Sequence, residues 1–143
     1  MRLYQEIGHV PPENAAPENV TATLIAEEPR YRALLAFAPH SEEPIGTVER
    51  DPIGVLTLCE SCAPYAGGYF GTIQEFYIVP EMRSQGVGQA MLEYAREIAL
   101  QKKWNRLEVT ATLDPSFARS VAFYRSFGFR DSGPRLYLPT VSH

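Results

Sequence analysis

A six-residue loop with two glycines sets the strongest constraint on how this chain can fold. The loop reads Arg83-Ser84-Gln85-Gly86-Val87-Gly88 and follows residues 72–79, a β-branched and aromatic run that is typical of a strand and that Pro80 ends. After the loop, apolar residues recur at three- and four-residue steps and predict an amphipathic helix. Its apolar positions are Val87, Met91, Tyr94, Ala95 and Ile98. Strand, glycine turn and helix in this order are the setting of a phosphate-binding loop.

The two glycines and the helix start together make a candidate anion site. Gly86 and Gly88 have no Cβ, so the backbone can come close to a bulky anion. The first turn of a helix offers N–H groups and the positive end of its dipole. Arg83 adds a positive charge. Short Gly-x-Gly loops that bind nothing also occur, so the surrounding pattern has to support the site.

Two common nucleotide loops fit this segment poorly. A nucleoside-triphosphate P-loop needs lysine and then serine or threonine after its last glycine, where this chain has Gln89 and Ala90. A dinucleotide fingerprint needs a third glycine at position 91, which is Met91.

The loop instead resembles the Arg/Gln-x-x-Gly-x-Gly/Ala loop of the GCN5-related N-acetyltransferases (GNAT). Residues 120–129, Ser-Val-Ala-Phe-Tyr-Arg-Ser-Phe-Gly-Phe, are similar to the family's second signature, a helix that carries Phe-Tyr and closes on Gly-Phe. Asp114 suits the N-cap of this helix, Pro115 its first position and Gly128 its end. Residues 106–112 read as a strand between the two signatures, and the likeness covers roughly residues 53–138.

This resemblance implies an α/β (α+β) fold with a mixed, mostly antiparallel central sheet and helices on both faces. It also implies acetyl-CoA as cosubstrate, with no metal. The pantetheine arm would bond the backbone of Ile78 and Val79 like an added strand. The loop and helix start would hold the pyrophosphate. The residues of that cradle are Arg83, Ser84, Gln85, Gly86, Val87, Gly88 and Gln89.

Acetyl transfer to an amine needs a base, since only the neutral amine attacks the thioester. Strand alternation predicts Glu75 on one face with Ile73, Tyr77 and Val79, and the resemblance implies that Glu75 acts on the amine through water. A solvated strand glutamate is the alternative. The resemblance implies that Tyr124 protonates the coenzyme A thiolate, and core packing is the rival role for its ring.

Two functions follow. The first is an N-acetyltransferase acting on a primary amine of a small molecule or peptide. The second is a catalytically weak or inactive acyl-CoA-binding module, which is suggested because Phe117 and Thr112 stand where many family members have asparagine. The identity of the acceptor is not encoded in any motif, because loops set it.

The N-terminal third departs from the family pattern, in which a strand precedes the first helix. Residues 1–8 look like the tail of that helix, and the first strand is apparently missing. Residues 20–28 predict a weak helix, and residues 32–38 and 53–59 predict strands. A missing edge strand would leave its neighbour unpaired, so we expect a possible homodimer.

Composition predicts one domain over residues 1–143, with 45% apolar and 21% charged residues. Neither a run of about 20 apolar residues nor a signal-peptide pattern is present, which favours the cytoplasm over a membrane, and no basic run suggests nucleic acid.

The charges are unevenly distributed along the chain. Residues 1–80 hold 4 Lys or Arg and 11 Asp or Glu, a net −7, whereas residues 81–143 hold 9 and 6, a net +3. The acidic half could attract a cationic amine, or its charges could only be solvated.

Cys59 and Cys62 form a lone Cys-x-x-Cys pair. A structural zinc site needs four ligands, and His9, His40 and His143 have no ligand spacing. We therefore expect two reduced cysteines near a loop.

Overall fold

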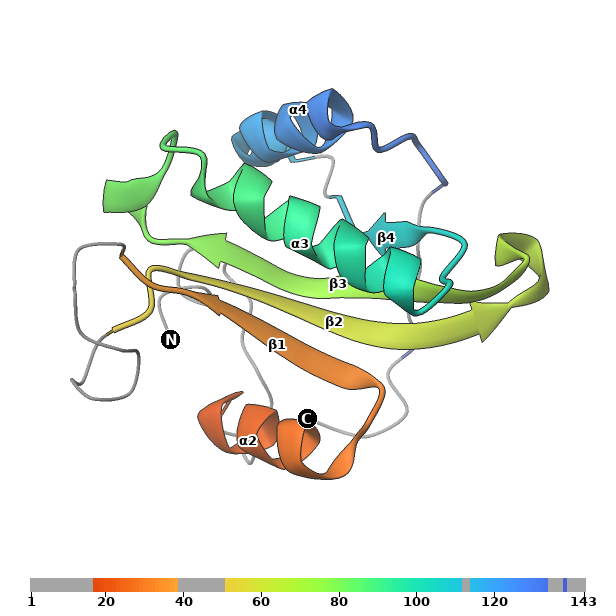
Figure 1. Ribbon diagram of the computed structural model, residues 1–143. Helices are drawn as coiled ribbons and strands as arrows, with labels where there is room; N and C mark the ends of the chain where they lie inside the picture. The colour runs from red at the N-terminus through yellow and green to blue at the C-terminus, as the bar shows by residue number, and fades with distance from the viewer. Residues whose placement is uncertain (1–16, 39–50, 112–113, 134–137, 139–143) are drawn as a thin grey trace. The chain divides into compact units, whose positions relative to one another are not determined.

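The computed structural model describes residues 17–38, 51–111, 114–133 and 138 (Figure 1). The chain divides into two compact units, Met1–Glu108 and Val109–His143, and each is described by itself. The predicted helix tail at residues 1–8, the missing first strand before it, and Thr112 lie outside the described residues.

Within the described residues, four strands form one sheet. Its strands are β1 (Tyr31–Ala36), β2 (Gly54–Ala63), β3 (Gly68–Ile78) and β4 (Leu107–Val109), in the order β1-β2-β3-β4. The pairs β1/β2 and β2/β3 are antiparallel. Helices α2 (Pro17–Glu27) and α3 (Val87–Gln101) lie on opposite faces of the sheet (Figure 1). The predicted fold class, a mostly antiparallel sheet with helices on both faces, is confirmed.

The core lies between α3 and the sheet. Leu56 and Leu58 of β2 have no exposed surface, and Met91, Leu92, Ala95, Ile98 and Ala99 of α3 are buried. The prediction that Tyr94 belongs to the apolar face is wrong, because its side chain is 57% exposed while Leu92 and Ala99 are buried instead. The apolar stripe of α3 is therefore centred on Leu92 and Ala95 and leaves Tyr94 at its margin.

A β-bulge interrupts β3 next to Glu75. Leu56 pairs with Phe76 and Leu58 pairs with Ile73, so Gln74 and Glu75 together stand opposite Thr57. Directly opposed residues share a face, which puts Ile73 and Phe76 on the α3 face with the two leucines. The prediction of strict alternation from Ile73 to Val79 is therefore wrong, since the extra residue moves Ile73 to the face opposite Tyr77.

The second unit contains the predicted Phe-Tyr helix. A 3₁₀ turn, η3 (Pro115–Phe117), comes first, and α4 (Ala118–Phe127) follows it directly. The Ser116 N–H donates to the Asp114 carboxylate at 2.9 Å, and this bond holds the pKa of Asp114 below its usual value. Gly128 ends the helix with φ 122°. The predicted cap, proline and terminal glycine are confirmed, with one 3₁₀ turn added before the helix.

No helix in the described part of the chain is long and apolar enough to cross a membrane.

Candidate functional site

The glycine loop turns sharply just before α3. Ser84 and Gly86 both have left-handed backbone conformations, with φ 62° and 83°. Gly86 is the N-cap of α3, and the first helical bond runs from the Ala90 N–H to the Gly86 carbonyl at 3.1 Å. The N–H groups of the residues between them precede the helical ladder. Alternating left-handed backbone beside a helix start makes a concavity lined with N–H groups, which binds anions.

The start of α3 has no side-chain cap among the described residues, and its first turn contains no acidic residue. A Cβ built on Gly86 meets nothing within 4 Å, so the positive φ, rather than crowding, is what requires glycine at this position.

Arg83 and Ile78, both predicted to contact the cosubstrate, lie against each other. The Arg83 Nε–H donates to the Ile78 carbonyl at 2.9 Å, and the guanidinium carbon lies 5.2 Å from the centroid of the Tyr77 ring. This hydrogen bond to the end of β3 fixes the Arg83 guanidinium at the start of the loop. Next along the chain, the Val79 N–H donates to the Ile53 carbonyl at 2.9 Å, and the Val79 carbonyl accepts the Met82 N–H at 2.9 Å. A pantetheine contact at Val79 would therefore use the second lone pair of its carbonyl.

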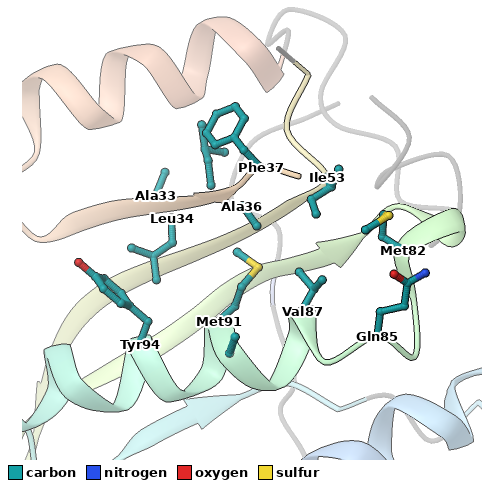
Figure 2. A pocket seen from close by; sticks show the side chains of 12 residues that line it. Ala33, Leu34, Ala36, Phe37, Ile53, Met82, Gln85, Val87, Met91 and Tyr94 are labelled. Carbon is teal, nitrogen blue, oxygen red and sulfur yellow. The ribbon is translucent and has the colours of Figure 1, made fainter. Parts of the chain in front are cut away.

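An apolar groove of about 580 Å³ lies beside the loop (Figure 2). β1 and the first half of α3 form its walls, with Leu34, Ala36 and Met91 among the lining residues. Gln85 also lines it and donates its amide N–H to the Glu81 carbonyl at 3.2 Å. The Gln85 side chain is thus turned toward its own loop, so a phosphate contact at this residue would use the backbone N–H.

The carboxylate of Glu75 lies on the other face of the sheet. The Glu75 N–H donates to the Thr57 hydroxyl oxygen at 2.9 Å, and the Thr57 hydroxyl in turn donates to the Glu75 carboxylate. Thr57 is 3% exposed and Glu75 is half-buried. The bulge thus aims the Glu75 side chain at the buried hydroxyl of Thr57.

Tyr31 of β1 extends this arrangement. The side chains of Thr57 and of Thr21 on α2 lie near its hydroxyl and act to lower its pKa. Burial raises the pKa of Tyr31, and the nearby Glu75 carboxylate raises it further. Sequence reasoning missed Thr57 and Tyr31. The one available signal is that Thr57 is the only hydroxyl in the apolar run at residues 53–58.

Tyr124 lies in α4 of the second unit among aromatic rings. Its ring centroid is 5.9 Å from that of Phe123 and 5.4 Å from that of Phe129. Burial raises the pKa of Tyr124 to about 12, so the phenol keeps its proton at any physiological pH. The ring is half-buried against these aromatic neighbours, and its hydroxyl is a hydrogen-bond donor.

Cys59 and Cys62 both lie within β2, so the strand extends past the expected loop boundary. Both are free thiols, and the described residues contain no group of three side chains that could hold a metal ion.

A model of the acetyltransferase (GNAT) family matches residues 2–129. The chain belongs to the GNAT acetyltransferase family. The resemblance drawn from the glycine loop and the Phe-Tyr helix is therefore confirmed. No curated protein matches the sequence.

Solved structures agree with the GNAT fold. A probable acetyltransferase is 20% identical with a TM-score of 0.73, covering 99% of this chain and 87% of the other. The aminoglycoside 6'-N-acetyltransferase AAC(6')-Ig from Acinetobacter haemolyticus is 22% identical with a TM-score of 0.66, covering 88% and 80%. A ribosomal-protein-alanine N-acetyltransferase from Brucella melitensis biovar Abortus 2308 is 16% identical with a TM-score of 0.63, covering 96% and 88%. At these identities the likeness shows the fold alone.

Proposed function

We propose that this GNAT protein is an N-acetyltransferase that moves an acetyl group from acetyl-CoA to a primary amine of a small molecule or peptide. Family membership supports acetyl transfer in general. The observation that carries the proposal is the loop before α3, where Ser84 and Gly86 have positive φ and lead into a helix start with no side-chain cap. We further propose that residues 1–143 act as a single domain of this family.

The loop and helix start are the proposed site for the pyrophosphate of acetyl-CoA. The backbone N–H groups of Val87, Gly88 and Gln89 fall in the first helical turn, where N–H groups have no helical acceptor. Arg83 supplies positive charge next to them. The pantetheine arm would then run along the end of β3, past Ile78 and Val79. β4 starts beside Gly71, whose N–H donates to the Arg106 carbonyl, and β4 is only three residues long. Its backbone pairing with β3 therefore ends before Ile78.

Glu75 is the proposed base. A primary amine has a pKa of about 8 for an α-amino group to about 10 for a side-chain amine, so it arrives mostly protonated and a proton has to leave before attack. Glu75 accepts that proton through a water molecule. The neutral nitrogen then attacks the thioester carbonyl carbon and a C–N bond forms. The nitrogen loses its second proton to solvent, and the C–S bond breaks to release the thiolate.

Tyr124 is the proposed partner of the departing thiolate. With its pKa raised to about 12, its hydroxyl is a weaker acid than an ordinary thiol at about 8.5. Complete proton transfer to the sulfur is therefore uphill, and the hydroxyl stabilises the thiolate mainly as a hydrogen-bond donor. Solvent can then supply the proton that completes the free thiol.

The acceptor is a primary amine whose class remains to be found by assay. Two of the structural neighbours carry names that specify an aminoglycoside and a protein alanine as acceptors. We therefore propose these two amine classes as the first to test. We also propose a cytoplasmic enzyme that requires neither metal nor nucleic acid.

The deciding experiment measures binding and turnover separately. Calorimetry would measure acetyl-CoA binding, and thiol release would follow turnover on a panel of aminoglycosides and alanine-terminated peptides. Glu75→Gln should lower kcat/KM about a hundredfold or more while acetyl-CoA binding is retained, since a positioned base contributes that much. Unchanged turnover in Glu75→Gln would remove this residue from the mechanism.

The acyl-CoA-binding module is the second candidate. Phe117 favours it, because this half-buried phenylalanine, rather than an amide side chain, precedes α4 as its N-cap. Acetyl-CoA binding that Gly86→Glu abolishes, together with no turnover on any amine, would identify the module.

A homodimer is our proposal for the assembly. β1 is an edge strand of the described sheet, and Leu35 on it is 54% exposed. An edge strand with an exposed apolar side chain can pair with a second copy.

A further inference from the structure

We propose that Thr57 is a positioning residue for acetyl transfer: its hydroxyl, next to Tyr31, fixes the carboxylate of Glu75 at the bulge of β3. The proposal deepens the function given above and rests on Glu75 being the base. It adds two residues, on β2 and β1, that have no place in the motifs read from the sequence.

Two hydrogen bonds of the Thr57 hydroxyl go to Glu75. A threonine hydroxyl has one hydrogen to donate and two lone pairs to accept with. The hydrogen goes to the Glu75 carboxylate, and one lone pair accepts the Glu75 N–H at 2.9 Å. The phenol of Tyr31 lies close enough to interact with the Thr57 side chain. Thr57 therefore lies between Tyr31 and the Glu75 carboxylate.

The strand register explains why Tyr31 can reach Thr57. Ala33 lies directly opposite Thr57. Tyr31 lies two residues before Ala33 on the same face, opposite Cys59. A long aromatic side chain can contact the diagonal cross-strand position. Because Ala33 has only a methyl group, the space over Thr57 is open to the phenol of Tyr31.

Because of the bulge, the placement of Glu75 depends on Thr57. Bulges commonly redirect a side chain near an active site. Here the N–H of Glu75 bonds a side chain, and the same side chain bonds the carboxylate, so one threonine holds both the backbone and the functional group. Burial of Thr57 strengthens both bonds, since water competes poorly for them.

Several titratable or charged groups lie on the face of the sheet that carries this carboxylate. The register puts Tyr31, Cys59 and Tyr77 on the same face of β1–β3, and Arg83 lies over the Tyr77 ring. From α2, Thr21 lies near Tyr31, and Glu28 is paired with Arg30. Thr57 is a neutral group through which the contacts of Glu75 can be altered without adding or removing a charge.

The test compares Thr57→Val, which keeps the shape and removes the hydroxyl, with Thr57→Ser, which restores the hydroxyl. Thr57→Val should lower kcat/KM about tenfold while leaving acetyl-CoA binding unchanged, since a hydrogen bond to a charged group has that size. Thr57→Ser should recover most of the activity.

Thr72→Val is the matched control. Thr72 is likewise buried, at 4% exposed, and lies on the same face of the sheet, opposite Cys59. The same substitution there should leave turnover unchanged. Ala33→Leu should resemble Thr57→Val in a milder form, since a leucine opposite Thr57 displaces the Tyr31 hydroxyl.

A double-mutant cycle separates positioning from general damage. If Thr57 acts through Glu75, Thr57→Val should have no further effect in the Glu75→Gln background. An additional tenfold loss in that background, or full activity of Thr57→Val alone, would overturn the proposal.

One further measurement separates this proposal from that of the base. If Glu75→Gln retains full activity, the base assignment fails, and NMR of Glu75 in the resting protein then tests positioning alone. Changed chemical shifts of the Glu75 amide proton and carboxyl carbon in Thr57→Val, restored in Thr57→Ser, support the positioning contact. Unchanged shifts in Thr57→Val overturn it.

Discussion

Arg83 donates its Nε–H to the carbonyl oxygen of Ile78 at 2.9 Å, which ties the cation of the glycine loop to the end of β3. Arg83→Ala should raise the KM for acetyl-CoA about tenfold with a smaller change in kcat, because a charge-assisted contact to phosphate contributes about 1.5–3 kcal/mol. Steady-state kinetics at two salt concentrations would measure this, since salt weakens the arginine's contribution.

The control for this prediction is Arg96→Ala. Arg96 is an exposed arginine on α3 that pairs with Glu93, so the substitution removes the same charge without touching the loop. Equal effects of the two substitutions on KM would mean that Arg83 acts only through net charge.

Gly86→Ala should weaken acetyl-CoA binding because the backbone at φ 83° disfavours any side chain, by about 1 kcal/mol for alanine. The open space around Gly86 excludes a clash as the cause. Gly133 offers a closely matched control, since it has φ 84° and equally open surroundings. Calorimetry should find weaker acetyl-CoA binding in Gly86→Ala only, and a comparable loss in Gly133→Ala would contradict a local role of the loop.

Gly71→Ala should destabilise the fold by about 1–3 kcal/mol, because its Cβ would clash with the rigid indole of Trp104. Gly54→Ala is the comparison. Its Cβ would lie 2.8 Å from the end of Ile78 and 3.0 Å from that of Met91, and both side chains can move. Urea denaturation should rank Gly71→Ala as the more destabilising of the two, and the reverse order would contradict this packing.

Leu35→Lys should reduce the proportion of dimer, because a charge on the edge strand β1 opposes pairing with a second copy. Light scattering over a range of protein concentrations would measure the mass. Leu100→Lys on α3 is the control, since Leu100 is even more exposed, at 72%. A wild-type protein that stays monomeric at every concentration would refute the dimer itself.

The two signatures allowed the fold to be predicted because each depends on local chemistry. Gly86 and the periodic residues of α3 specify a turn and a helix start within a few residues of each other. Asp114 specifies a cap in the same way. Such features require only neighbours along the chain, so the sequence alone contains the information.

The site was predicted less completely because it depends on register. The bulge opposite Thr57 arises from pairing between two strands, and no residue pattern within β3 marks it. Alternation therefore placed Ile73 on the wrong face. Thr57 and Tyr31 were missed for the same reason, since each contacts Glu75 or its partner only after the strands have aligned.

The buried phenol of Tyr124 should make the stability of the fold sensitive to alkali. Burial raises its pKa from 10.0 to about 12, so its contribution to the free energy of unfolding is complete below pH 10 and is lost as the pH rises through 12. A shift of this size corresponds to about 2–3 kcal/mol. Denaturant unfolding of wild type and Tyr124→Phe at a series of alkaline pH values would measure it, and the stability advantage of wild type should shrink over that window. The stability advantage of wild type over Tyr31→Phe should also shrink as the pH rises, because burial raises the pKa of Tyr31 too. A difference between wild type and Tyr124→Phe that stays constant with pH would contradict burial of the hydroxyl and would favour a solvated phenol.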